Sequence, residues 1–213
     1  MAGGWSTPPT IRMSQWDDWF ADVNTWQPCG GPGGFNDYDS IEVGDGSTDS
    51  GLSLAASETQ LSLWSLASAP LTLGSDLTNS VTNACGTSAA LDPTDFSLLT
   101  NRQVIGVDQD AIDASLISSS GTPGGKAGNQ VFAKVEPNGE VIVGLFNTTT
   151  KLSSGPVAIA TTAAAIGLPP DPNGYEVHDL WAGQSVVVGG QTTYDISSAG
   201  DISATVPAEG VAP

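Results

Sequence analysis

The chain has 213 residues, of which 13% are charged, and its formal net charge at pH 7 is −18. With only five lysine and arginine residues it is a poor match for a phosphate backbone or an anionic membrane, so we expect neither nucleic acid nor membrane as a partner. It contains no apolar run of the length that a bilayer span requires. A neutral substrate such as a sugar fits this composition.

The few cysteine and histidine residues limit the chemistry further. Cys29 and Cys85 allow one disulfide in an oxidising compartment, and the sequence leaves open whether they pair. The single histidine, His178, lies in a segment that we predict to be a strand, where a structural role is expected. We therefore expect no metal site and no cofactor, and carboxylates as the agents of any chemistry.

The first half of the chain alternates between helical and short apolar segments. Residues 13–26 carry apolar side chains at helical spacing, and a glycine-rich loop follows at residues 30–34. Ser53 is typical of an N-cap, which predicts a helix to about residue 67. The apolar segment at residues 70–74 then predicts a buried strand.

A further helix is predicted from Pro93, with Asp92 as its N-cap, to about Asn101. This succession of strands and helices favours a parallel α/β arrangement over residues 1–117.

The pattern changes at a Ser/Gly-rich turn cluster, residues 118–125. Two alternating segments, residues 131–135 and 140–146, flank an Asn-Gly dipeptide and predict a β-hairpin. Additional strands are predicted at residues 175–181, 185–188 and 201–206. We therefore expect residues 118–213 to form an antiparallel β-sandwich.

One polar cluster, Asn36-Asp37-Tyr38-Asp39, follows the glycine-rich loop. Carboxylate and amide groups can hydrogen-bond sugar hydroxyls, but Asn and Asp also favour turns by bonding to their own backbone. The spacing alone leaves both interpretations open. Asp17 and Asp18 are adjacent, so their side chains diverge on a helix and we expect both to be solvated.

Several segments carry a resemblance to a known family. Residues 31–40, GPGGFNDYDS, resemble the segment GPGGWNDPDM of family 27 glycoside hydrolases, the α-galactosidases. Four further segments are similar to motifs of that family in the same order: residues 62–71, SLWSLASAPL; residues 74–77, GSDL; residues 98–110, LLTNRQVIGVDQD; and residues 177–181, VHDLW.

The resemblance implies an α/β plus all-β fold. Residues 1–117 would be the C-terminal part of a (β/α)8 TIM barrel, and residues 118–213 the antiparallel β-sandwich domain that follows it. It also implies a secreted, extracellular hydrolase that removes terminal α-D-galactosyl residues with retention of configuration. The partner that it implies is a galactoside or another neutral oligosaccharide. We expect the signal peptide to lie upstream of this sequence.

The same resemblance assigns roles to residues of the polar cluster. Asp39 matches the family's pocket aspartate and Ser40 the residue beside it, so both are expected to contact substrate. Asn36 and Asp37 are expected to brace the loop. Ser40 stands where the family usually has Met.

The two aspartates that perform the family's chemistry have no clear counterpart. The K-x-D segment of the nucleophile is missing from the sequence, and the segment that carries the acid/base aligns upstream of Met1. Asp17 is the remaining candidate for the acid/base. We expect this chain to be a fragment that is inactive alone and that associates with itself or with the missing barrel half. The alternative is a non-catalytic sugar-binding or interaction module derived from that fold.

Overall fold

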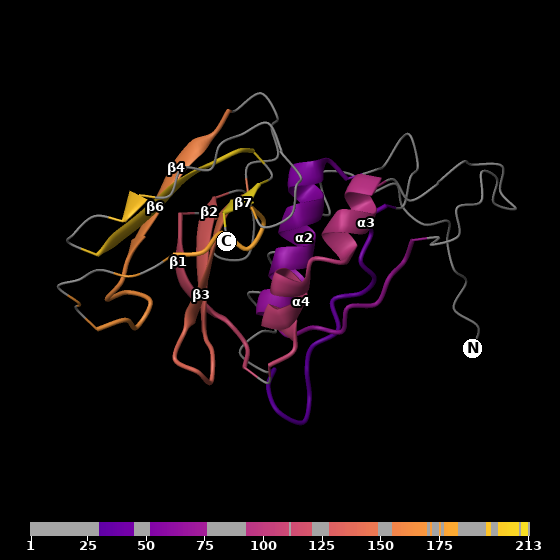
Figure 1. Cartoon of the computed structure of the whole chain (residues 1–213), viewed down its shortest axis with the longest axis horizontal. Helices are drawn as coiled ribbons and strands as arrows, with labels where there is room; N and C mark the ends of the chain where they lie inside the picture. Colours follow the sequence, from indigo (N-terminus) through magenta and orange to yellow (C-terminus); the bar gives the residue numbers. More distant parts are fainter. Residues whose placement is uncertain are drawn as a thin grey trace, which may run out of the picture.

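The computed structural model describes residues 30–44, 52–75, 93–110, 112–120, 128–148, 155–169, 171, 175, 177–182, 195–196, 200–208 and 210–212. Over these residues, helices lie on one side of the molecule and antiparallel strands on the other (Figure 1). None of the helices in these ranges is long and apolar enough to cross a lipid bilayer. The helix predicted at residues 13–26 and the strand predicted at residues 185–188 lie outside the described residues.

Helix α2, Leu54–Leu66, confirms the helix predicted after Ser53. The Ser53 hydroxyl accepts a hydrogen bond from the Ala56 amide at 3.1 Å, as an N-cap does. At the other end, the amides of Ser68 and Ala69 donate to the carbonyls of Ser65 and Trp64. This pair of hydrogen bonds is a Schellman motif. Its left-handed position is usually occupied by glycine, but here it is occupied by Ser68, which has a φ of 47°.

The helix predicted from Pro93 to Asn101 is shorter than expected. Helix α3, Pro93–Leu99, ends before Asn101, and a separate helix α4, Arg102–Asp108, follows. Asn101 divides them because its carboxamide oxygen accepts from the amides of Gln103 and Val104, which makes Asn101 the N-cap of α4. The same side chain donates to the Leu180 carbonyl at 2.9 Å, so it also attaches α4 to a distant segment.

Two extended segments of the first half run parallel. The Ile41 amide donates to the Thr72 carbonyl at 2.7 Å, and the Gly74 amide donates to the Ile41 carbonyl at 2.9 Å. The prediction of a buried strand at residues 70–74 is therefore wrong in two respects: the pairing is a single bridge, and Leu73 is 40% exposed. The part of the chain that the structure describes contains no closed barrel.

The remaining strands form two antiparallel sheets. The first sheet has the order β1-β2-β3-β7 and the second β4-β6-β5. The strands are β1, Ser115–Ser119; β2, Asn129–Val135; β3, Val141–Asn147; β4, Val157–Thr162; β5, Asp195–Ile196; β6, Asp201–Val206; and β7, Val211–Ala212. The predicted hairpin is confirmed as β2 and β3, and the strand at residues 201–206 as β6. Strand β1 spans the predicted boundary between residues 117 and 118.

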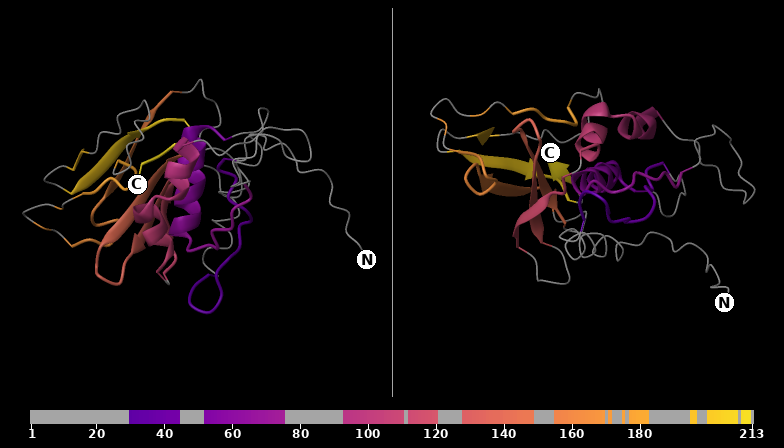
Figure 2. Two further views of the ribbon diagram at one scale, coloured as in Figure 1. Left: turned by 45° about the vertical axis from the view of Figure 1, so that its right-hand side comes forward. Right: turned by 90° about the horizontal axis from the view of Figure 1, so that it is seen from below.

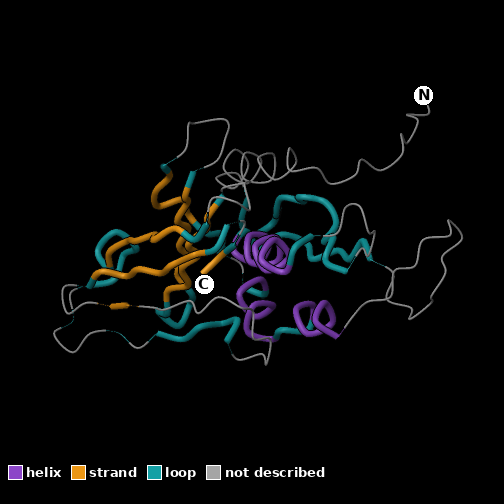
Figure 3. The backbone as a smooth tube through the Cα atoms, turned by 90° about the horizontal axis from the view of Figure 1, so that it is seen from above, coloured by secondary structure: helices purple, strands orange, loops and turns teal. Residues whose placement is uncertain are grey.

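The first sheet is the middle of three layers, with the helices on one face and the second sheet on the other (Figures 2 and 3). Strand alternation explains this arrangement, because neighbouring side chains point to opposite faces. Val131 and Leu145 pack between the two sheets, whereas Phe132 and Phe146 pack toward α2. A Cβ at Gly144 would lie only 2.8 Å from the Leu66 side chain, so this glycine lets β3 and α2 approach closely.

The strand predicted at residues 175–181 is not found in the described part of that segment, which is irregular and ends in a turn. The Asp179 carboxylate accepts from the amides of Trp181 and Ala182 and thereby closes the turn. Trp181 is buried by this turn and its indole N–H donates to the Ser62 hydroxyl of α2 at 3.0 Å. His178 is exposed in this segment and is not in a strand.

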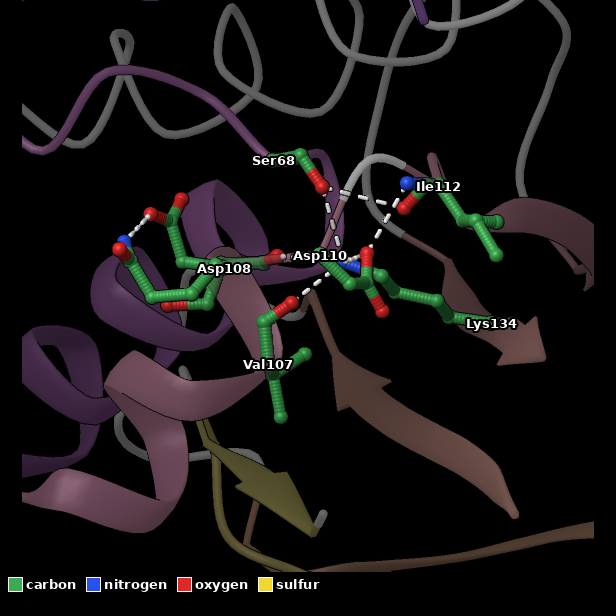
Figure 4. A network of polar contacts seen from close by, with 8 residues as sticks. Ser68, Val107, Asp108, Asp110, Ile112 and Lys134 are labelled. Carbon is green, nitrogen blue, oxygen red and sulfur yellow. Dashed lines mark hydrogen bonds and ion pairs between the residues drawn. The ribbon is translucent and has the colours of Figure 1, made fainter. Parts of the chain in front are cut away.

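A buried lysine joins the helices to the first sheet (Figure 4). Lys134 of β2 points toward the helices, and its ammonium group is completely buried. It forms an ion pair with Asp110 at 2.7 Å and donates to the Ser68 hydroxyl at 2.8 Å and to the carbonyls of Ser65 and Val107. These carbonyls are at the C-terminal ends of α2 and α4, where the helix dipole favours a cation.

Two glutamates have strongly raised pKa values. Burial, together with a hydrogen bond to Asp110 and its negative charge, raises the pKa of Glu136 to about 7. Burial and the nearby Asp179 raise the pKa of Glu58, in α2, to about 7 as well. The pKa of Asp110 is lowered, because its hydrogen bonds to Glu136, Lys134 and the Ile112 amide outweigh the opposing effect of burial.

Substitution of Ser68 tests why this left-handed position is not glycine. Ser68→Gly relieves about 1 kcal/mol of backbone strain, but it removes a hydroxyl that accepts from Lys134 and donates to the Ile112 carbonyl. Those two buried bonds are worth about 2 kcal/mol or more. We expect a stability order, measured by urea unfolding, of wild type above Ser68→Gly above Ser68→Ala. A glycine variant as stable as the wild type would contradict this account of the network.

The raised pKa values predict how stability changes with pH. A carboxyl group whose pKa is higher in the folded state favours folding when it is protonated. The contributions of Glu58 and Glu136 are therefore full below the ordinary pKa of 4.5 and are lost as pH rises through about 7. We expect the Tm to fall from about pH 5 to about pH 8, and the fall to be smaller in Glu58→Gln/Glu136→Gln. An unchanged slope in the double variant would contradict the assignment.

Candidate functional site

The polar cluster predicted from the sequence lies in a turn directly before the parallel bridge. Asp39 has a φ of 76°, a left-handed conformation that few non-glycine residues adopt and that aspartate tolerates better than most. The Asp37 carboxylate accepts from the Asp39 amide at 2.9 Å and so holds the turn that leads into this conformation. Because the chain turns at Asp39, the paired segment begins only at Ile41, and Asp39 and Ser40 precede the pairing residue.

The structure brings Asp39 and Ser40 together. One carboxylate oxygen of Asp39 accepts from the Ser40 amide at 2.7 Å and from the Ser40 hydroxyl at 3.1 Å. Asp39 is exposed and Ser40 is half-buried, so the carboxylate is accessible while one side of it is fixed by its neighbour. The remaining carboxylate oxygen provides an acceptor for a ligand.

Two side chains of helix α2 form hydrogen bonds with the main chain of this turn. The indole N–H of Trp64 donates to the Asp39 carbonyl at 3.0 Å. The carboxamide of Gln60 accepts from the Glu42 amide at 2.9 Å and donates to the Ser40 carbonyl at 3.4 Å. Gln60 was not predicted as a site residue. Its position four residues before Trp64, on the same face of a predicted helix, was the available signal.

Two glycines let other segments pass close to the site. A Cβ at Gly74 would lie 3.0 Å from the Ser40 Cβ, so the second parallel segment lies directly beside Ser40. A Cβ at Gly30 would lie 3.1 Å from the Asn36 carboxamide nitrogen and 2.0 Å from the Asp113 carboxylate. Asn36 therefore lies against the start of the loop.

The other site predictions lie outside the described residues. These are Asp17, the candidate acid/base, and the two residues of the possible disulfide, Cys29 and Cys85.

The hydrogen bonds of the cluster are local to the turn. Asp37 and Asp39 both accept hydrogen bonds from the loop main chain, as aspartates in turns do. Across the described ranges, no group of three or more His, Cys, Asp or Glu residues is arranged to hold a metal ion.

Two family models match the sequence. Residues 10–110 match the model described as alpha galactosidase A, and residues 126–212 match the model described as the alpha galactosidase C-terminal beta sandwich domain. The second match covers most of the described strands, and the first covers the Asp39 turn and all three described helices.

Individual relatives agree with these matches. The chain is 30% identical over 207 residues to an alpha-galactosidase of Oryza sativa subsp. japonica, covering 92% of this chain and 42% of that protein. It is 35% identical over 155 residues to a probable alpha-galactosidase of Dictyostelium discoideum, covering 70% of this chain and 35% of that protein. The chain thus spans well under half the length of these relatives.

Solved structures show the same fold. The crystal structure of alpha-galactosidase I from Mortierella vinacea matches 89% of this chain and 41% of its own, with a TM-score of 0.66 and 26% identity. A GH27 β-L-arabinopyranosidase from Geobacillus stearothermophilus matches 94% of this chain and 41% of its own, with a TM-score of 0.70 and 18% identity, which bears on the fold alone. Since both halves match in the expected order, the chain belongs to the α-galactosidase family, glycoside hydrolase family 27.

Proposed function

We propose that this chain contributes the galactose-binding floor of an α-galactosidase, a retaining hydrolase of terminal α-D-galactosyl residues. The parallel segments around Ile41 and Leu73 would then be the last strands of a (β/α)8 barrel, whose active site lies at one end of its strands. The observation that carries this proposal is the accessible carboxylate of Asp39, presented in a left-handed turn beside Ser40. The names of the relatives supply the substrate class.

Asp39 would bind substrate and would not react with it. A carboxylate can accept hydrogen bonds from two neighbouring hydroxyls of a pyranose ring, and Ser40 can add a third contact. Retaining hydrolysis needs a further pair of carboxyl groups about 5–5.5 Å apart, one as nucleophile and one as acid/base. The part of the chain that the structure describes offers Asp39 with one oxygen already bonded to Ser40, which suits orientation of a ring.

A second candidate is a sugar-binding module that performs no hydrolysis. It rests on the same turn, in which Asp37 and Asp39 accept hydrogen bonds from the loop main chain and the Asp39 carboxylate stays exposed. Binding without turnover is the outcome that distinguishes it from the hydrolase.

Substitution of Asp39 tests the binding site. We expect Asp39→Ala to weaken galactose binding by about 100-fold, because it removes charge-assisted hydrogen bonds to hydroxyls. Calorimetric titration with galactose measures the affinity. Asp201→Ala removes an exposed aspartate of β6 and serves as the matched control, with unchanged affinity.

Hydrolysis of an aryl α-galactoside by the same preparations separates the two candidates. We expect this chain alone to bind galactose and to show no turnover. Turnover that is lost in Asp17→Asn would identify Asp17 as the acid/base. An affinity for galactose that Asp39→Ala leaves unchanged would overturn the proposed site.

We also propose that the protein is extracellular and that this chain associates with a partner through exposed apolar side chains. Leu73 is 40% and Phe96 59% exposed, and such side chains favour association with a second copy or with further barrel segments. Sedimentation velocity measures the association.

A further inference from the structure

We propose that Gln60 and Trp64 are positioning residues for the sugar site, and that they act by fixing the main chain from which the Asp39 carboxylate projects. The inference rests on the proposed function for its ligand, but its structural part stands without one. Both side chains form hydrogen bonds to main-chain atoms of the turn, so both act through the backbone.

Every residue from Asp39 to Glu42 is anchored through its main chain. Trp64 binds the Asp39 carbonyl, and Gln60 binds the Ser40 carbonyl and the Glu42 amide. The intervening Ile41 uses its own amide and carbonyl to pair with the parallel segment at residues 72–74. The carboxamide of Gln60 thus occupies the edge opposite that segment and bonds two successive peptide groups, as a neighbouring strand would.

Both side chains are buried, so their polar groups depend on hydrogen bonds with the turn. Gln60 is 1% exposed and Trp64 is completely buried. A buried carboxamide or indole N–H without a partner is costly, and the partners of both groups are main-chain atoms of the turn. The polar groups of the turn and of these two side chains therefore provide each other's hydrogen-bond partners. If the turn moved, both sides would lose these hydrogen bonds.

The conformation of Asp39 gives this support a functional consequence. A left-handed aspartate is less stable than an extended one, so it persists only where its surroundings fix it. If the carbonyls of Asp39 and Ser40 lost their donors, the turn could relax to negative φ. The carboxylate would then leave the position in which it accepts from Ser40.

A ligand-free experiment tests the structural part on the full chain. Gln60→Met keeps the volume of the side chain and removes both hydrogen bonds, and Trp64→Phe removes the indole donor but keeps an aromatic ring. The Ser40 amide, which donates to the Asp39 carboxylate, reports on the position of that carboxylate. We expect its hydrogen exchange, measured by NMR, to be about tenfold faster in each variant. The control is Gln103→Met, which makes the same substitution at an exposed position of α4. We expect it to leave the hydrogen-exchange rate of the Ser40 amide unchanged.

Two results would overturn the structural part. One is an unchanged exchange rate at Ser40 in Gln60→Met and Trp64→Phe. The other is an equal acceleration of every amide in α2, which would show a general loss of stability and no specific hold on the turn.

Galactose affinity tests the functional part. We expect Gln60→Met to weaken binding by about tenfold, and to have a much smaller effect in an Asp39→Asn background, because the two residues act through one contact. Equal effects in both backgrounds would overturn the positioning role. If the wild type binds no galactose, the proposed function fails, while the exchange rate at Ser40 still decides whether Gln60 and Trp64 hold the turn.

Discussion

The ammonium group of Lys134 is buried where water cannot solvate it, and its partners come from three separate segments. The C-terminal end of α2 provides the Ser65 carbonyl and the Ser68 hydroxyl, α4 provides the Val107 carbonyl, and the segment after α4 provides the Asp110 carboxylate. An unpaired buried charge is strongly destabilising, so these contacts favour the observed packing of the helices on the first sheet. The left-handed serine at the end of α2 is explained by the same requirement.

Helix α2 is the second element on which the arrangement depends. It is buried along most of its length and includes polar residues that an ordinary core helix would lack. Each polar contact is directed at a different part of the molecule: Gln60 at the Asp39 turn, Ser62 at Trp181, and Ser65 at Lys134. The apolar side chains of α2 provide the packing, and these polar ones determine its orientation.

The sequence predicted the features that depend on local rules. Ser53 as an N-cap and Asn138-Gly139 as a hairpin turn are determined by their own backbone chemistry, and both elements are confirmed. The predictions that failed depend on distant partners. The strand at residues 175–181 gave way to a turn closed by Asp179, and the buried strand at residues 70–74 has an exposed Leu73. Gln60 was missed because helical spacing places it on one face with Trp64 but does not identify the distant peptide groups that its carboxamide binds.

The all-round burial of α2 also determines how the chain responds to heat or denaturant. The sequence places a domain boundary near residue 117, which would allow the two halves to unfold in separate steps. In the structure, α2 loses hydrogen-bond partners if either half unfolds, because its contacts extend from Asp39 in one half to Lys134 and Trp181 in the other. We therefore expect the two halves to unfold together, and damage to the sheets to reach the Asp39 turn through α2.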